Sequence, residues 1–354
     1  MLNNFKKKRI FITGSTGFKG TWLSYILASS GAKVMGYALP QMVNEKSHYN
    51  DLNLKNKMTQ IEGDIRNREE LISAVQKFEP DYVFHLAAQA LVRPSYNDPH
   101  NTFETNVMGS VNILDAVLAT KSVRALVYVT SDKCYENNEW VWGYRENDRL
   151  GGRDPYSASK AAAEHVFFAY SKSFIEMNSQ LGAASVRAGN VIGGGDWSVD
   201  RIVPDCIRCI DQDIPITLRN PLATRPWQHV LEPLSGYLLL ALKLYSNPSK
   251  FSGSWNFGPS TFKTATVGEL AKSIVTHFKE GSIIEKPDLN QPHEAGLLQL
   301  NCDKTHQELN WKSTWDLEKT FKVTADWYKR VMSGENVENV TKEQIDEYFR
   351  NMND

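Results

Sequence analysis

The chain has 354 residues, of which 41% are hydrophobic and 23% are charged, and its formal net charge is −1. These values are typical of a globular protein with one large domain or two closely packed ones, and the interspersed charges argue against a nucleic-acid partner. No stretch reaches the ~20 apolar residues that span a bilayer, and no signal peptide is recognisable. The Cys206-x-x-Cys209 pair has no second pair or histidine nearby, which makes it a poor metal site. We therefore expect a cytoplasmic protein without a membrane, nucleic-acid or metal partner.

The opening stretch has the pattern of a strand, a glycine-rich turn and a helix. Residues 9–13 predict a buried strand, and residues 21–29 have apolar positions at helical spacing. Glycines at such a turn let a diphosphate approach the backbone, and the helix N-terminus favours an anion. The pattern predicts a dinucleotide site, although an ordinary tight turn also fits it. The expected cofactor contacts in this turn are Gly14, Thr16, Gly17, Phe18, Lys19 and Gly20.

Strands and helices alternate through the first half of the chain. Composition and periodicity predict further strands at residues 33–38, 58–62, 81–86, 125–130 and 183–188. Helical spacing is found at residues 68–78, 103–119 and 157–174. This alternation indicates an α/β fold, a Rossmann-type doubly wound parallel sheet with the ligand at the carboxyl ends of its strands.

The second half of the chain is less regular and predicts a smaller α+β substrate-binding lobe. Helical spacing recurs at residues 231–244, 266–279, 317–330 and, more weakly, 336–354. We expect the dinucleotide-binding domain to comprise residues 1–190, with residues 230–256 returning to it. The substrate lobe then comprises residues 191–229 and 257–354.

The ends of the second, third and fourth strands also bear on the cofactor. Residues 36–40 contain neither an acid nor an arginine, so the choice between NAD and NADP is not determined there. Asp64 and Ile65 are candidate adenine-end contacts, although Asp64 equally fits a cap or turn residue. His85 is interpreted as a structural core histidine. The small or apolar residues that follow it, past which a cofactor can lie closely, are Leu86, Ala87 and Ala88.

Tyr156 and Lys160 lie four residues apart on a predicted helix, which places both on one face. A nearby ammonium lowers the pKa of a phenol from its usual value of about 10. Such a pair can take a proton from a substrate alcohol while hydride leaves to a nicotinamide. The same spacing occurs on ordinary solvated helices, but the upstream glycine turn favours the catalytic interpretation.

Ser131, Asp132 and Lys133 follow the fifth predicted strand, at the edge where the site is expected. Ser131 can hydrogen-bond the reacting hydroxyl, and Asp132 can donate a proton. Lys133 can act as a base only in its uncharged form, which burial or a neighbouring cation favours. An exposed turn is the alternative interpretation of Asp132 and Lys133.

Together these residues resemble the extended short-chain dehydrogenase/reductase family, from about residue 7 to about residue 330. The glycine pattern, residues 85–89, Asn106, the Tyr156–Lys160 pair and residues 187–190 match it in chain order. Three longer blocks are similar to the branch of CDP-glucose 4,6-dehydratases. These blocks comprise residues 13–23, residues 130–136 with 140–146, and residues 186–197 with 225–233.

The resemblance implies bound NAD and a nucleotide-sugar substrate. Tyr156 removes the C4 hydroxyl proton while NAD accepts hydride, water then leaves across C5–C6, and the hydride returns to C6. Related dehydratases carry Thr-Asp-Glu where this chain has Ser131, Asp132 and Lys133, so the base at C5 stays open between Lys133 and a residue elsewhere. The implied contacts to the nucleoside diphosphate are Arg201, Arg219 and Arg225, with Asn190 at the diphosphate, Trp197 at the base and His293 as a loose match.

Three alternatives are weighed against a CDP-glucose 4,6-dehydratase: a dehydratase for another nucleotide sugar, an epimerase, and a non-catalytic NAD-binding regulator. Asp132 argues against an epimerase, which needs no acid at C6, and the intact Tyr156–Lys160 pair argues against a regulator. The two long predicted helices at residues 103–119 and 157–174 pair across subunits in members of the family, so we expect a homodimer.

Overall fold

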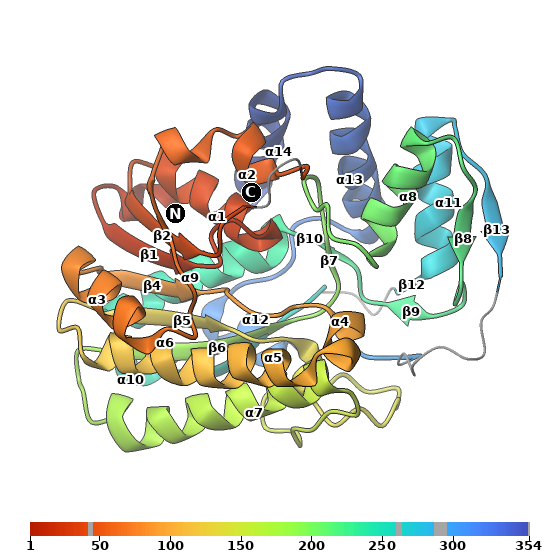
Figure 1. Ribbon diagram of the computed structural model, residues 1–354. Helices are drawn as coiled ribbons and strands as arrows, with labels where there is room; N and C mark the ends of the chain where they lie inside the picture. Colours follow the sequence, from red (N-terminus) through yellow and green to blue (C-terminus); the bar gives the residue numbers. More distant parts are fainter. Residues whose placement is uncertain (42–44, 260–263, 287–295, 353–354) are drawn as a thin grey trace.

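The computed structural model describes residues 1–41, 45–259, 264–286 and 296–352. Its centre is a seven-stranded sheet in the order β11-β6-β5-β4-β1-β2-β3, and every pairing in it is parallel (Figure 1). The predicted Rossmann-type fold is confirmed. The strands are β1 (Arg9–Thr13), β2 (Lys33–Ala38), β3 (Thr59–Glu62), β4 (Tyr82–His85), β5 (Ala125–Val129), β6 (Gly182–Ala188) and β11 (Gly253–Phe257).

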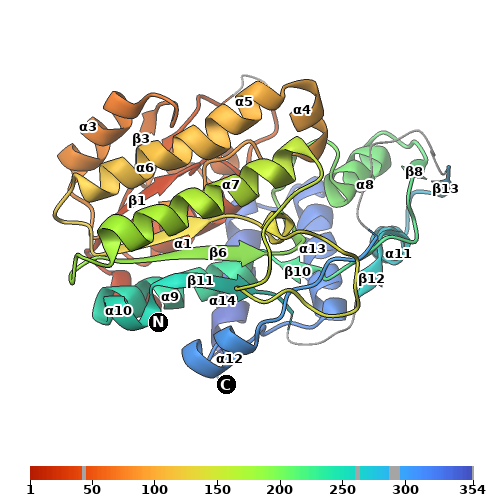
Figure 2. The same cartoon turned by 90° about the horizontal axis from the view of Figure 1, so that it is seen from below.

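Helices cover both faces of this sheet because its strands are apolar on both sides. One layer consists of α3 (Arg68–Phe78), α6 (Gly109–Leu118) and α7 (Pro155–Tyr170), which lie side by side in Figure 2. The other face is covered by α1 (Phe18–Ser29) and α9 (Leu231–Ser246), whose apolar side chains form a separate core with Ile10 and Ile12 of β1. Alternate residues of one strand thus enter two different cores.

The predicted helix at residues 103–119 is interrupted. It consists of α5 (Pro99–Phe103), a π-helical segment η3 (Glu104–Met108) and α6. A second π-helical segment, η5 (Ser171–Ile175), ends α7. Because π-turns redirect side chains within a helix, Asn106 of η3 turns inward. Its amide donates to the Gln89 carbonyl at 2.9 Å and to Ser159 Oγ of α7 at 2.8 Å.

The second half of the chain adds β11 and a smaller group of elements beyond the strand ends, at the right of Figure 1. β11 was not predicted as a strand, and it pairs with β6 from Gly253↔Ala184 to Phe257↔Ala188. The smaller group contains α8 (Ile202–Asp211), β8 (Ile216–Leu218), β9 (Thr224–Arg225), β12 (Ala265–Thr266), α11 (Val267–Phe278) and β13 (Ile283–Glu285). The chain reaches it through the short strands β7 (Val191–Ile192) and β10 (Gln228–His229).

The structure also contains several short helices. They are η1 (Leu2–Phe5), α2 (His48–Asp51), η2 (Leu54–Asn56), α4 (Val92–Asn97), η4 (Asp132–Cys134), α10 (Pro248–Phe251) and α12 (Asp303–Leu309). Within the described ranges, no helix has both the length and the apolar character that a bilayer crossing requires.

The last two helices, α13 (Leu317–Met332) and α14 (Val337–Asn351), return to the first part of the chain. The ring of His48 lies edge-on between Trp22 of α1 and Trp327 of α13. Tyr25 donates to Glu338 of α14 at 3.1 Å. The C-terminal helices therefore pack against the dinucleotide-binding part, and the predicted division into two domains stays a prediction.

Candidate active site

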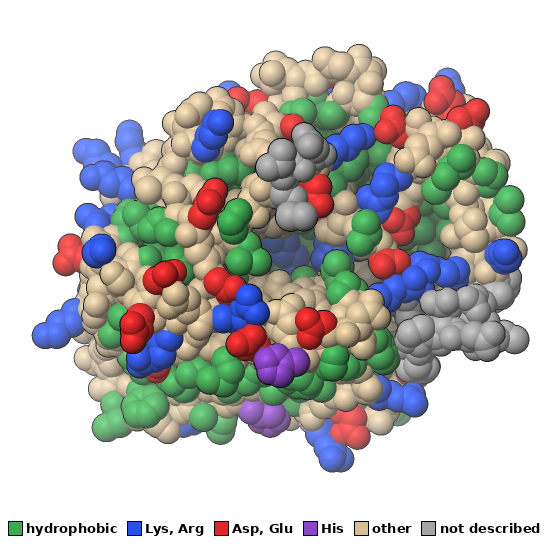
Figure 3. Space-filling view, viewed as in Figure 1, with side chains coloured by type: hydrophobic (Ala, Val, Ile, Leu, Met, Phe, Trp, Pro, Cys, Tyr) green, Lys and Arg blue, Asp and Glu red, His purple; other side chains and the backbone are tan. Residues whose placement is uncertain are grey.

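A cavity of about 1360 Å³ lies at the carboxyl ends of the strands, bounded by the smaller group of elements. Figure 3 shows the hollow near the centre of this face, with Lys and Arg side chains inside it. Most of the residues predicted for the site line this one cavity. They are Gly14, Thr16, Gly17, Phe18, Lys19, Gly20, Asp64, Ile65, Leu86, Ala87, Ala88, Ser131, Asp132, Lys133, Tyr156, Lys160, Asn190, Arg201, Arg219 and Arg225.

The glycine turn has room on one side only. Gly14 has φ +69°, and a Cβ on it would lie 2.7 Å from the Ala87 nitrogen, whereas a Cβ on Gly20 would lie 2.0 Å from the Gly14 oxygen. These two glycines are required for packing between β1, α1 and the end of β4. Gly17 is exposed and caps α1, which begins three residues earlier than predicted. The side of Gly17 that faces the cavity, together with the free N–H groups at the start of α1, fits a diphosphate.

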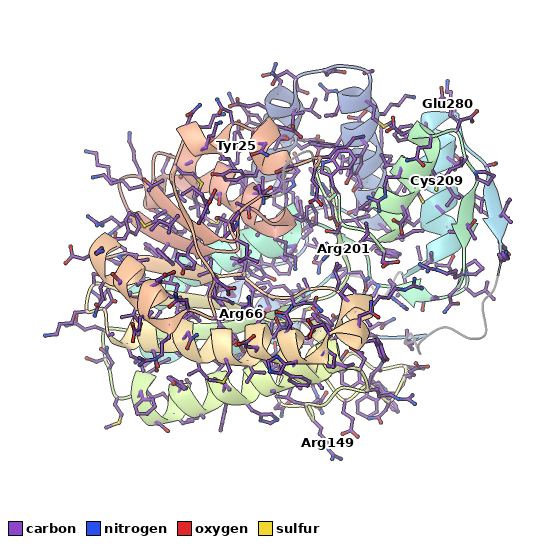
Figure 4. The ribbon with its side chains drawn as sticks, viewed as in Figure 1. Tyr25, Arg66, Arg149, Arg201, Cys209 and Glu280 are labelled. Carbon is purple, nitrogen blue, oxygen red and sulfur yellow. The ribbon has the colours of Figure 1, made fainter. Side chains whose placement is uncertain are left out.

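Asp64 and Arg66 follow β3 at the predicted adenine end. Asp64 accepts from the Arg66 nitrogen and from Arg66 Nε, both at 2.9 Å. These hydrogen bonds lower the pKa of Asp64. The carboxylate thus has the contacts of a turn residue while it also lines the cavity. Figure 4 labels Arg66, which no sequence motif indicated, and Arg201, which lies across the cavity from it.

Tyr156 and Lys160 occupy the first turns of α7, which Asp154 caps by accepting from the Ser157 nitrogen at 2.9 Å. Burial lowers the pKa of Lys160 to about 8. Burial also raises the pKa of Tyr156 to about 12, against the lowering effects of a hydrogen bond with Ser131 and of the Arg201 charge. The expected lowering of this pKa by Lys160 is therefore not seen, because desolvation of the phenolate dominates.

Ser131 and Asp132 lie directly beyond β5, where η4 begins. Ser131 Oγ donates to Asp132 Oδ1 at 3.0 Å. Burial raises the pKa of Asp132, although the charges of Lys133, Lys19 and Arg225 act in the opposite direction. A raised pKa favours the protonated carboxyl that a general acid requires. The exposed-turn interpretation is wrong for Asp132, because only 4% of its surface is accessible.

Cations gather on the wall of the cavity that the smaller group of elements forms, and one more comes from α1. Arg201 pairs with Asp196 at 2.8 Å, and Arg219 lies 3.6 Å from Asp200. Lys19 enters from α1, where burial, followed by the Arg201 charge, lowers its pKa to about 8. This wall suits an anionic substrate, because guanidinium groups bind phosphate oxygens in a forked geometry.

Two residues at this wall, Arg93 and Asp200, were not predicted. Arg93 of α4 lies 3.1 Å from Asp200 and so faces Arg219 across one carboxylate. Arg225 donates to the carbonyl oxygens of Thr224 at 2.8 Å and Gly296 at 3.3 Å. No local sequence pattern indicated Arg93 or Asp200, since they are brought together only by folding.

Two predicted substrate contacts are not placed in the cavity. Trp197 does not line it; its ring packs edge-on against Tyr328, 5.2 Å between centroids, and lies beneath the Lys46 ammonium. Tyr328 donates to the carbonyls of Gly193 and Asp196, and this loop geometry turns the indole toward the core. His293 lies outside the described residues.

The sequence matches a known family over most of its length. The family profile described as GDP-mannose 4,6 dehydratase covers residues 11–324. The chain belongs to this family. It is 45% identical over 351 residues to a CDP-glucose 4,6-dehydratase of Salmonella typhimurium, covering 98% of both chains. A dTDP-glucose 4,6-dehydratase of Haemophilus influenzae is 22% identical, over 90% of this chain and 97% of the relative.

Solved structures with the same fold include both dehydratases and epimerases. A dTDP-glucose 4,6-dehydratase from Bacillus anthracis in complex with NAD has a TM-score of 0.75 and 22% identity, covering 92% of this chain and 98% of that chain. A Thermus thermophilus UDP-glucose 4-epimerase in complex with NAD has a TM-score of 0.76 and 23% identity, covering 91% and 99%. Dehydratases and epimerases share this fold, so the fold does not identify the reaction. The residues at the strand ends must distinguish dehydration from epimerisation.

Proposed function

We propose that this protein is an NAD-dependent CDP-glucose 4,6-dehydratase that forms CDP-4-keto-6-deoxyglucose. The observation that carries the proposal is the buried Asp132 carboxyl in the same cavity as Tyr156 and Lys160. Oxidation at C4 needs a base such as the Tyr156–Lys160 pair. Loss of water from C6 needs an acid such as Asp132. The 45% identity to a CDP-glucose 4,6-dehydratase across 98% of both chains supports the nucleotide and the sugar.

The glycine turn fits NAD, since its open side faces the cavity beside the N-terminus of α1. When bound, NAD supplies the acceptor and donor of hydride for this redox cycle. Leu86, Ala87 and Ala88 line the same cavity and would flank the cofactor, with Asp64 and Ile65 toward the adenine end. Residues of the protein then carry out the proton transfers.

Three protons move in this scheme. Tyr156, in its phenolate form, takes the proton of the C4 hydroxyl as C4 becomes a ketone, and Lys160 holds positive charge nearby. The ketone acidifies the C5 hydrogen, which Lys133 removes. Asp132 donates its proton to the C6 oxygen, so that the carbon–oxygen bond breaks and water leaves. The hydride then returns to C6 while Lys133 gives a proton back to C5, which completes the 4-keto-6-deoxy sugar. The nucleoside diphosphate is held by Asn190, Arg201, Arg219 and Arg225.

An epimerase is the second candidate, because epimerases share the fold. Epimerisation at C4 needs no acid at C6, and a buried carboxyl with a raised pKa is costly to keep without a use. The decisive test incubates the protein with CDP-glucose, dTDP-glucose, UDP-glucose and GDP-mannose and follows the 4-keto product by its absorbance in alkali. We expect product from CDP-glucose. Product only from another nucleotide would reject the nucleotide assignment, and C4 epimers alone would reject dehydration.

Lys133→Met is expected to prevent removal of the C5 proton while C4 oxidation continues. In deuterated water, the wild-type product should carry solvent deuterium at C5, and the variant should convert substrate at least about 100-fold more slowly. Lys121→Met, on the exposed turn before β5, is the matched control. Undiminished deuterium incorporation in Lys133→Met would assign the base to another residue.

We infer that two copies of the chain associate through the layer formed by α5, η3, α7 and η5. Large apolar side chains lie exposed along it: Phe103, Met108, Phe168, Phe174 and Met177. Exposed apolar side chains that recur along one helical layer are typical of an interaction surface, and the corresponding helices pair across subunits in the family that the sequence resembles. The four free cysteines suit a reducing compartment, and we place the protein in the cytoplasm.

A dimer is the expected species in light scattering at micromolar concentration. Phe168→Glu, which places a charge at a side chain that is 61% exposed, should yield monomers of unchanged fold. Leu222→Glu, at an apolar residue outside this layer that is 81% exposed, should remain dimeric. A monomeric wild-type protein would overturn the proposal.

A further inference from the structure

Glu164 is a buried carboxylate immediately behind the site. It lies on α7 one turn after Lys160 and two turns after Tyr156, and 2% of its surface is accessible. Positions four and eight residues apart share one helix face, so the three side chains project from the same side of α7. Glu164 does not line the cavity.

The Glu164 carboxylate is saturated with hydrogen bonds. Arg187 of β6 donates Nε to Oε1 at 2.9 Å and Nη2 to Oε2 at 2.7 Å. Ser185 donates to Oε2 at 2.9 Å, and Thr130 donates to Oε1. Burial would raise the pKa of Glu164, but Arg187 and these hydrogen bonds hold it below its ordinary value. The carboxylate is therefore an ion, and its oxygens have no capacity for further strong partners.

These contacts join the two segments that carry the catalytic groups. Thr130 directly precedes Ser131 and Asp132 at the end of β5, whereas Glu164 belongs to the helix of Tyr156 and Lys160. Arg187 extends the connection: its Nη1 donates to the Tyr135 hydroxyl at 2.6 Å, just beyond η4. One carboxylate thus fixes the strand end that bears the acid against the helix that bears the base.

Glu164 also balances the charge of Lys160. Four titratable groups face Lys160: Glu164 on its own helix, Cys134 on η4, His85 at the end of β4 and Lys19 on α1. Burial lowers the pKa of His85 to about 3 and raises that of the Cys134 thiol, so both are neutral, and Lys19 is another cation. Glu164 is the anion of this group, and it opposes the desolvation of the Lys160 ammonium.

We propose that Glu164 is a positioning residue for the proposed dehydration, acting in two ways: it fixes the end of β5 against α7 and keeps Lys160 charged beside Tyr156. The inference rests on the proposed function, because it concerns the same proton transfers. It adds a residue outside the cavity to those that determine the reaction.

The first test is Glu164→Gln combined with Arg187→Met. The single change would leave Arg187 buried without a counter-ion, whereas the pair of changes removes both charges. As the pH rises, an unsupported Lys160 loses its proton earlier, so the alkaline limb of the C4 oxidation rate, measured with CDP-glucose in a single turnover, should move down by about one pH unit. Glu232→Gln is the matched control: it alters another buried carboxylate, which accepts from the Thr314 and Trp315 nitrogens, and it should leave this limb in place.

The second test, Thr130→Val, keeps both charges and removes the hydrogen bonds of the Thr130 hydroxyl to Glu164 and to the Val186 carbonyl. Product formation should slow about tenfold more than C4 oxidation in a single turnover, with no movement of the alkaline limb. An unmoved limb in a folded double variant overturns the charge role, and equal slowing of both steps in Thr130→Val overturns the positioning role. If the double variant does not fold, Thr130→Val decides the positioning role, and Glu164→Gln alone decides the charge role by the position of the same alkaline limb. A wild-type protein that forms no 4-keto product would reject the proposed function itself, independently of these comparisons.

Discussion

Tyr156→Phe is expected to reduce turnover of CDP-glucose by at least about a thousandfold. In the proposed scheme the Tyr156 phenolate accepts the proton of the C4 hydroxyl, and phenylalanine retains the ring without the oxygen. The hydroxyl is buried beside Ser131, whose hydrogen bond acts to lower its pKa. Loss of the first proton transfer should stop the reaction before any reduced cofactor forms.

This expectation is checked by near-ultraviolet absorbance of the reduced cofactor in a single turnover and by the NAD content of the purified protein. NAD should remain bound, since the glycine turn is untouched. Tyr49→Phe removes another buried phenol, for whose oxygen the described part of the chain offers no hydrogen-bond partner, and should retain activity. Normal turnover in Tyr156→Phe would exclude Tyr156 as the base.

Asp132→Asn is expected to separate the two halves of the reaction. An amide cannot give a proton to the C6 oxygen, so elimination of water should slow by about 100-fold or more. C4 oxidation should continue, because Tyr156 and Lys160 are unchanged. Reduced cofactor should therefore accumulate in the variant, whereas it stays at a low level in the wild-type protein.

The pH dependence gives an independent measure of the same role. Burial raises the pKa of Asp132, and an acid is active only while protonated, so elimination by the wild-type protein should slow as the pH rises through that value. Asp132→Asn should lack this dependence. Asp115→Asn, at a surface carboxylate of α6 that pairs with Arg68, is the control. If oxidation and elimination are lost together in Asp132→Asn, the carboxyl is not the acid of the second step.

Local patterns predicted the helices and strands near the site well. β1, β2 and α3 begin and end at the predicted residues, because alternation and helical spacing are properties of consecutive side chains. The helix at residues 103–119 was one exception. Its periodicity continues through η3, and only contacts with Gln89 and Ser159 explain why Asn106 faces inward there.

Electrostatics at the site were less predictable. The spacing of Tyr156 and Lys160 suggested that the ammonium controls the phenol, but burial is the larger effect on both groups. Desolvation depends on how many atoms from other segments surround a side chain, and this is not encoded in local spacing. Trp197 shows the same limit, since a family motif identified the residue but its loop turns the ring toward Tyr328.

The order of residues by itself determined that a strand, a glycine turn and a helix open the chain, that Tyr156 and Lys160 share a helix face, and that Asp132 follows a strand. These features depend on neighbours within a few positions, where backbone geometry repeats. Only the tertiary structure brought Glu164, Arg187 and Thr130 to one point and placed Arg93 opposite Arg219 around Asp200. Such contacts depend on how whole strands and helices pack, because each partner lies on a different element.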